Sequence, residues 1–160
     1  MSNAQLTSAK EFLIRLSENS GVSGYEESLT PLVKNEFAPL ADSIQQDSLG
    51  NIYALKKGTQ GRYTIMLAAH MDEIGLMVKK IDEKGFIRFS TVGGVDQRTL
   101  LSQEVIIHGK EEVLGVIGSI PPHLLTGDED KAVKIEDMGI DVGMPVEETK
   151  EAHWVIFFFL

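Results

Sequence analysis

Apolar and polar positions follow a helical period near the start of the chain and a strand-like alternation later. Phe12, Leu13 and Leu16 recur at helical spacing between residues 8 and 17, and residues 19–21 (Asn-Ser-Gly) follow as a stop signal. This pattern predicts a first amphipathic helix over residues 8–17 that packs on a sheet.

A second helix is expected soon after, although its start can be placed in two ways. Ser23 and Glu26 have the S-x-x-E spacing of a capping box, which would begin a helix there. Alternatively, Thr30 caps a helix that begins at Pro31, because a proline beyond the first turn would remove a hydrogen bond. Pro39 marks the expected end of this helix.

Strand signals begin after residue 43. Ile44, the polar turn 47–51 and the run 52–55 predict two strands joined by a tight loop. The run Thr64–Ala69 is apolar with little polar alternation, which predicts a buried strand in a parallel or mixed sheet. His70 follows that strand directly.

After residue 72 the chain reads as short strands separated by glycine and proline. The runs alternate with Gly85, Gly93-Gly94, Gly109 and Pro121-Pro122, a punctuation typical of a small antiparallel barrel or sandwich. The runs expected as strands are 74–81, 86–91, 104–108 and 113–120. The next helix is expected only near residue 147.

Composition narrows the classes of function. The formal net charge is −9 and the pI is near 4.9, and no cluster of Lys and Arg could neutralise a row of phosphates, so a nucleic-acid partner is excluded. The chain contains no cysteine, so any metal must be held by His and carboxylates, and a reducing cytoplasm is the expected compartment. We expect no secretory signal and no membrane association.

The most informative chemistry is the pair His70 and Asp72. Imidazole is the commonest protein ligand for zinc, and an acidic residue two positions later can orient the ring or contact the metal itself. A zinc site needs at least three protein ligands, so further ligands must come from elsewhere. The remaining histidines are expected to be structural: His108 in an exposed turn, His123 in a loop and His153 in the terminal segment. The acidic cluster 128–130 is expected to be a solvated loop.

Several motifs together resemble the M42 family of metallo-aminopeptidases, the glutamyl and deblocking aminopeptidase group. The resemblance covers about residues 12–143 and is carried by motifs in family order. These are residues 20–26 (SGVSGYE), 47–51 (DSLGN), 68–75 (AAHMDEIG), 93–96 (GGVD), 115–118 (GVIG) with 121–123 (PPH), and 136–143 (EDMGIDVG).

The resemblance implies an α/β fold in which a zinc-peptidase-like domain is interrupted by a small inserted β-barrel that mediates homo-oligomerisation. It divides the chain into residues 1–72, the first part of the catalytic domain, and residues 73–152, the β-barrel insertion. Residues 153–160 are then expected to be an aberrant apolar tail, as a truncated or frameshifted reading frame would give. The alternative is that residues 154–160, WVIFFFL, cover an exposed sheet edge.

The resemblance also implies an activity, which is the removal of N-terminal residues from peptide substrates by two-metal hydrolysis. Two divalent metals, zinc or cobalt, would be bound per site in the complete family. His70 corresponds to one metal ligand and Asp72 to the carboxylate that orients it. The bridging aspartate, the general-base glutamate and the other ligands have no counterpart here, so the chain alone is expected to be inactive. Glu147 and Glu148 fall in an expected short helix, not in a catalytic pair.

Two alternatives remain at this stage. The chain could be a non-catalytic β-barrel interaction module that pairs with itself or with a longer homologue. More remotely, it could be an endoglucanase, as some family members have been labelled. That activity requires a carboxylate pair beside a sugar groove, and no such pair or aromatic platform is evident.

Overall fold

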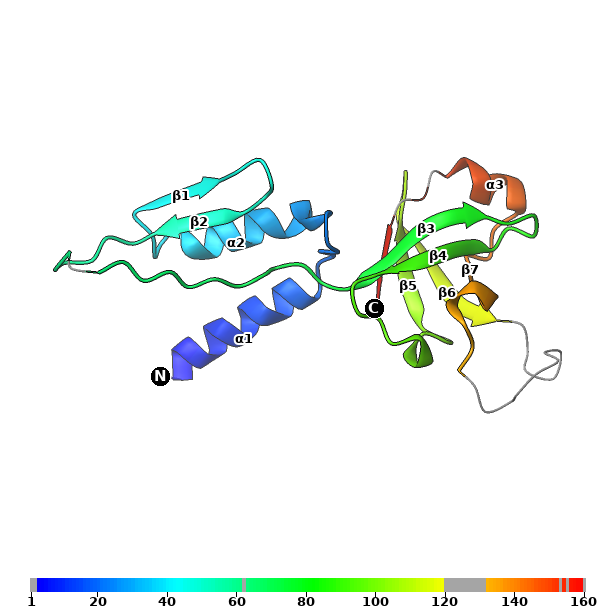
Figure 1. Ribbon diagram of the computed structural model, residues 1–160, viewed down its shortest axis with the longest axis horizontal. Coiled ribbons are helices and arrows are strands. Elements are labelled where there is room, and N and C mark those ends of the chain that lie inside the picture. Colours follow the sequence, from blue (N-terminus) through cyan, green and yellow to red (C-terminus); the bar gives the residue numbers. More distant parts are fainter. Residues whose placement is uncertain (1–2, 62, 120–131, 153, 155, 160) are drawn as a thin grey trace. The chain divides into compact units, whose positions relative to one another are not determined.

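The computed structural model describes residues 3–61, 63–119, 132–152, 154 and 156–159 (Figure 1). The chain divides into two compact units, Met1–Glu73 and Ile74–Leu160, and each is described by itself. The first unit contains two α-helices and a β-hairpin, and the second contains a curled antiparallel sheet. The fold is therefore mixed α and β. Which function each unit has, and whether the second is an insertion, stay predictions.

Both predicted helices of the first unit are present, but the second begins at Leu29, at neither of its two predicted starts. Helix α1 spans Asn3–Ser17, so it includes the expected segment and begins earlier. Helix α2 spans Leu29–Phe37 and ends before Pro39. The guanidinium of Arg15 on α1 donates a hydrogen bond of 2.9 Å to the carboxylate of Glu36 on α2, which ties the two helices together.

The capping box expected at Ser23 is wrong. A short 3-10 turn, η1 (Glu26–Ser28), precedes α2, and its N-cap residue is Tyr25, whose side chain makes no capping bond. The Glu26 carboxylate accepts a hydrogen bond of 2.8 Å from the backbone N–H of Gly24, whereas the Ser23 N–H donates to the Glu73 carbonyl, so neither bond of the expected reciprocal pair is formed. The Ser23 hydroxyl instead donates a hydrogen bond to the carboxylate of Asp72, 49 residues later in the sequence.

The predicted hairpin is confirmed. Strands β1 (Ser43–Gln46) and β2 (Ile52–Leu55) pair in antiparallel register. The Asp47 carboxylate holds the connecting turn, because it accepts hydrogen bonds from the backbone N–H of Leu49 at 3.0 Å and of Asn51 at 2.9 Å. Asp47 also accepts from the side chains of Asn51 and Tyr53.

The buried strand predicted at Thr64–Ala69 is wrong for this chain. The segment carries no strand assignment, Figure 1 draws it as a plain trace, and all of its side chains are exposed. Leu67 is 94% exposed, and Tyr63, Ile65 and Met66 are each more than four-fifths exposed. The apolar pattern describes a strand covered on both faces, and within the described residues no neighbouring strand pairs with it.

The second unit is a closed barrel of antiparallel strands. Around the barrel the order is β3-β4-β7-β6-β5-β8, and β8 returns to β3. The strands are β3 (Gly75–Ile81), β4 (Ile87–Val92), β5 (Glu104–His108), β6 (Val113–Ser119), β7 (Met138–Asp141) and β8 (Ile156–Phe159). Closure leaves this sheet without an unpaired edge strand.

The barrel core comes from alternate positions of these strands. Ile87 and Phe89 on β4 point inward, as do Val105 and Ile107 on β5, and all are buried. Their burial follows the two-residue period from which the strands were predicted. The core cluster consists of Leu76, Ile87, Phe89, Leu100, Val105, Ile107, Ile117, Met138, Ile140 and Trp154.

Two strands were not foreseen. Strand β7 lies within the EDMGIDVG motif, and β8 lies in the segment expected to be an aberrant tail. In the structure β8 pairs with both β3 and β5. This backbone pairing agrees with the alternative prediction, in which the segment covers a sheet edge. The short helix expected near residue 147 is confirmed as α3 (Val146–Glu151).

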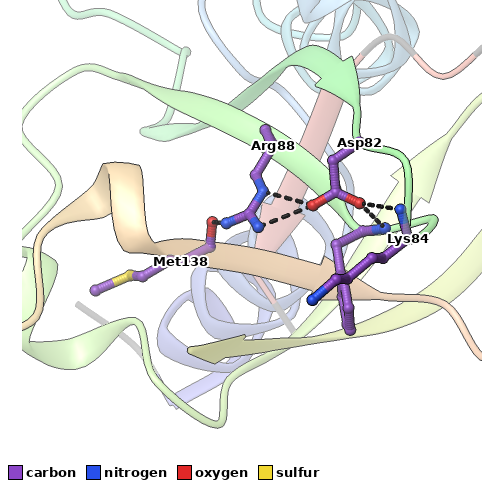
Figure 2. Close-up of polar contacts among 5 residues, drawn as sticks. Asp82, Lys84, Arg88 and Met138 are labelled. Atoms are coloured by element: carbon purple, nitrogen blue, oxygen red, sulfur yellow. Dashed lines mark hydrogen bonds and ion pairs between the residues drawn. The ribbon is translucent and has the colours of Figure 1, made fainter. Parts of the chain in front are cut away.

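A partly buried ion pair ties the β3–β4 hairpin to β7 (Figure 2). The Arg88 guanidinium donates to one carboxylate oxygen of Asp82 at 2.8 and 3.0 Å, and to the carbonyl of Met138 at 2.7 Å. The other Asp82 oxygen accepts from the backbone N–H groups of Lys84 and Phe86. Although partial burial raises the pKa of Asp82, the hydrogen bonds from Arg88 and this turn bring it below its ordinary value.

Some expected positions are corrected or lie outside the described residues. His108 is the last residue of β5 rather than part of an exposed turn, and its half-buried ring lies 3.1 Å from the Glu112 carboxylate. His123, His153 and the acidic cluster 128–130 lie outside the described residues. Among the described residues, no helix is both long and apolar enough to cross a membrane.

Candidate metal site

The candidate site lies at the end of the first unit, where the exposed segment 63–69 runs into His70. The structure brings His70 and Asp72 together as the sequence predicts. The Nδ1 atom of His70 lies 3.0 Å from the Oδ1 atom of Asp72 and 3.0 Å from the Asp72 main-chain carbonyl oxygen. The His70 side chain is 85% exposed and that of Asp72 is 35% exposed.

The geometry favours one tautomer of the neutral His70 ring. Both atoms near Nδ1 are oxygen acceptors, so Nδ1 carries the proton of the neutral ring and Nε2 keeps its lone pair. A neutral imidazole with a free Nε2 and an Nδ1–H donated to a carboxylate is the form that ligates metals. His70 with Asp72 therefore fits a role as one metal ligand and its orienting carboxylate.

A third residue, Ser23, completes this arrangement. Its hydroxyl donates to the Oδ2 atom of Asp72, so the two carboxylate oxygens are bonded by different partners. The Ser23 hydroxyl is the largest cause of a pKa of Asp72 below its ordinary value; partial burial opposes this effect and His70 adds to it. The Ser23 hydrogen bond thus strengthens the preference of Asp72 for the ionised form, which is the acceptor that the His70 N–H needs.

The backbone around Ser23 is joined to the site independently of its side chain. Val22 and Glu73 form a parallel bridge, with the Glu73 N–H donating to the Gly21 carbonyl at 2.9 Å. The Glu73 carboxylate accepts from the Gly21 N–H at 3.0 Å. Val22 and Leu29 are buried beneath this loop, and a Cβ at Gly21 would collide with the Leu29 side chain. The motifs 20–26 and 68–75 therefore form one local structure.

This arrangement offers a single metal ligand rather than a complete centre. Within the part of the chain that the structure describes, no group of three or more His, Asp, Glu or Cys side chains could hold a metal ion. Sequence reasoning found His70 and Asp72 from their spacing but missed Ser23, because the S-x-x-E spacing suggested a local cap. The motif at residues 20–26, which contains Ser23, was the signal that could have drawn attention to it.

Comparisons with known proteins find similar sequences in one peptidase family. The profile of the M42 glutamyl aminopeptidase family matches residues 50–155. Lysyl aminopeptidase from Pyrococcus furiosus is 39% identical over 145 residues, which cover 88% of this chain and 41% of that protein. The chain thus spans about two-fifths of the length of this curated relative.

Solved peptidase structures also resemble this chain. The TET aminopeptidase from a marine-sediment Thaumarchaeota archaeon superimposes with a TM-score of 0.85 at 33% identity, over 96% of this chain and 44% of that one. The TET1 peptidase of Pyrococcus horikoshii, which can assemble into a tetrahedron or a large octahedral shell, matches with a TM-score of 0.77 at 33% identity, over 93% of this chain and 46% of that one.

Proposed function

The chain belongs to the M42 glutamyl aminopeptidase family, and from this membership we propose that its activity is the metal-dependent removal of N-terminal residues from peptides. The observation that carries the proposal is the contact between His70 Nδ1 and Asp72 Oδ1, which leaves Nε2 free for a metal. The Pyrococcus furiosus relative and the Thaumarchaeota TET protein are aminopeptidases, and this pair lies within the residues that match the family.

We assign roles only to residues that the chain contains. His70 would hold one of two divalent metals through Nε2, and Asp72 would orient the ring and keep its Nδ1 protonated. When bound, such metals supply a water of lowered pKa for attack on the peptide carbonyl and stabilise the charge that develops on the carbonyl oxygen. Zinc and cobalt both accept imidazole nitrogen, so the donor type does not select between them.

The remaining ligands, we propose, come from the part of the family's domain that this chain does not span. The exposed apolar segment 63–69 supports this, because its unpaired backbone and its two apolar faces need neighbouring strands and a cover on each side. The same missing part would then supply both the sheet neighbours of the segment and the metal ligands around His70. The chain alone is accordingly proposed to be inactive.

We further propose that the barrel forms contacts between copies of the chain. One support is the assembly described for the Pyrococcus horikoshii TET1 peptidase. The other is the outer face of β6, where the apolar side chains of Leu114 and Val116 are exposed beside the half-buried Ile106 of β5. Leu114→Glu should lower the mass of any oligomer measured by light scattering while leaving the Trp154 fluorescence of the folded unit unchanged.

The cytoplasm is the compartment that we propose, because a chain without cysteine suits a reducing environment.

Hydrolysis of a panel of chromogenic aminoacyl substrates tests the proposed activity. The purified chain is assayed with Zn²⁺ or Co²⁺, alone and mixed with the complementary C-terminal part of the Pyrococcus furiosus relative. We expect no turnover from the chain alone and metal-dependent turnover from the mixture, lost in His70→Ala and kept in His108→Ala. Turnover that survives His70→Ala would refute the assigned ligand. Turnover by the chain alone that His70→Ala abolishes would refute the proposed need for further ligands.

A further inference from the structure

The folded chain does not use Ser23 for the local helix cap that the sequence suggests. The 3-10 turn η1 begins at Glu26 without a side-chain cap, and the Glu26 carboxylate accepts from the Gly24 N–H instead. The Ser23 hydroxyl donates to Asp72, a residue 49 positions later in the sequence. Ser23 is therefore used for a long-range contact at the candidate metal site.

The Asp72 carboxylate lies between donors on its two oxygens. His70 Nδ1 is 3.0 Å from Oδ1, and the Ser23 hydroxyl bonds to Oδ2. A carboxylate held by one donor can still turn about its side-chain bonds, because the terminal torsion of aspartate is broad. A second donor on the other oxygen removes that freedom and fixes the plane of the group relative to the His70 ring.

The loop that carries Ser23 is held without the help of its hydroxyl. The Val22–Glu73 bridge and the hydrogen bond from the Gly21 N–H to the Glu73 carboxylate anchor it, and Val22 is fully buried. Removing the hydroxyl alone should therefore leave the loop in place and free only the carboxylate. This separation makes the role of the hydroxyl testable.

We propose that Ser23 is a positioning residue of the metal site, whose hydroxyl holds Asp72 in the orientation that keeps His70 protonated on Nδ1 and leaves Nε2 free for a metal. The inference rests on the proposed function of His70 and Asp72 and extends it by one residue. Ser23 itself would contact neither metal nor substrate; it acts through Asp72 on the ring.

The tautomer of His70 in the metal-free chain measures this role directly. Long-range ¹H–¹⁵N correlation spectra of the ¹⁵N-labelled full chain, recorded at a pH where the ring is neutral, separate Nδ1–H from Nε2–H forms. We expect mostly Nδ1–H in the wild type and a shift toward Nε2–H in Asp72→Ala. In Ser23→Ala the ratio should move the same way by about two- to tenfold, the weight of one net hydrogen bond. Ser23→Thr, which keeps the hydroxyl, should restore the wild-type ratio.

Glu73→Ala is the matched control, because it removes the other side-chain tether of this loop without touching Asp72. The main-chain carbonyl near His70 is unchanged in every variant, so differences report the carboxylate. A wild-type ratio in Ser23→Ala, or an equal shift in Glu73→Ala, would overturn the role of Ser23. A wild-type chain that is mostly Nε2–H, or an Asp72→Ala variant without effect, would instead overturn the proposed function of the pair.

Discussion

Replacing Arg88 by methionine tests how the barrel holds its β3–β4 hairpin against β7. Methionine keeps an apolar stem of similar length but removes the guanidinium, which makes two bonds to Asp82 and one to the Met138 carbonyl. A hydrogen bond to a charged group contributes about 1.5–3 kcal/mol. The bonds share one side chain and are not additive, and the Arg88 and Asp82 side chains keep 31% and 19% of their exposure. We therefore expect a loss of about 2–3 kcal/mol in unfolding free energy.

Thermal unfolding followed by tryptophan fluorescence measures this loss. Trp154 is the only tryptophan of the chain and is packed in the core of the same unit, with 9% of its surface exposed, so its signal reports the barrel. For a domain of about 60–100 residues each kcal/mol corresponds to about 4–8 °C, so Arg88→Met should melt about 10 °C or more below the wild type. An unchanged melting temperature would refute the reasoning.

Arg98→Met is the matched control for that experiment. The Asp96–Arg98 pair is also multiply bonded, and the Arg98 side-chain and backbone hydrogen bonds lower the pKa of Asp96 to about 2. The pair is exposed and its members are two residues apart in the sequence, so the unfolded chain can form it as well. The control should melt close to the wild type. A large fall in the melting temperature of Arg98→Met would contradict the argument that an ion pair between residues close in sequence contributes little to stability.

The lowered pKa of Asp82 predicts how the stability lost in Arg88→Met depends on pH. Its ordinary value is 3.8, and the folded chain holds it lower. The stability that the charged carboxylate contributes is thus complete above the unfolded pKa and is lost as the pH falls through the folded pKa. The difference in melting temperature between wild type and Arg88→Met should therefore narrow below about pH 4. A difference that is constant into acid would contradict a charge-assisted pair.

Two further substitutions test the barrel interior and the hairpin of the first unit. In Gly115→Ala the added Cβ would lie 2.6 Å from a methyl group of Ile140, so we expect the unfolding free energy to fall by about 1–3 kcal/mol. Denaturant titration followed by tryptophan fluorescence measures this loss. Gly118→Ala is the control, because its Cβ would meet nothing within 4 Å and should not lower the stability of the barrel. Asp47→Ala should lower the protection factor of the Asn51 backbone amide in hydrogen exchange, because that amide donates to the Asp47 carboxylate. The hydrogen bond from the Asn51 side chain is the main cause of the lowered Asp47 pKa, so in the wild type the protection factor, corrected for the intrinsic exchange rate at each pH, should fall only once acid protonates Asp47.

Strands and helices whose sequence pattern lies within the element itself could be predicted from the sequence. The strand predicted over residues 86–91 is present as β4, in which Ile87 and Phe89 alternate with polar residues and are buried. Strand β7 was missed because Gly139 and the preceding acidic 3-10 turn interrupt its short apolar pattern. The backbone pairing of β8 depends on two strands distant in sequence, β3 and β5, so its own composition could not decide between a tail and a strand.

The candidate site shows the same limit. The contact between His70 and Asp72 spans two residues, so their spacing was enough to predict it. Ser23 is 49 residues from Asp72, and its S-x-x-E spacing favoured a nearby partner that the folded chain does not use. A short polar side chain can satisfy either a helix end or a remote carboxylate, and only the path of the backbone decides which.

The wrong prediction for Thr64–Ala69 and the incomplete metal site have one physical cause. An apolar strand is buried only when other strands pair with both its edges and other elements cover both its faces, and a catalytic zinc site needs at least three protein ligands. Both requirements are met by residues distant in sequence, whereas the pattern that reveals them is local. Among the described residues neither requirement is fulfilled, although the segment ends directly at His70. The exposed side chain of Leu67 and the proposed ligand His70 lie close together in the sequence, and we propose that the residues that pair with this segment also complete the metal site.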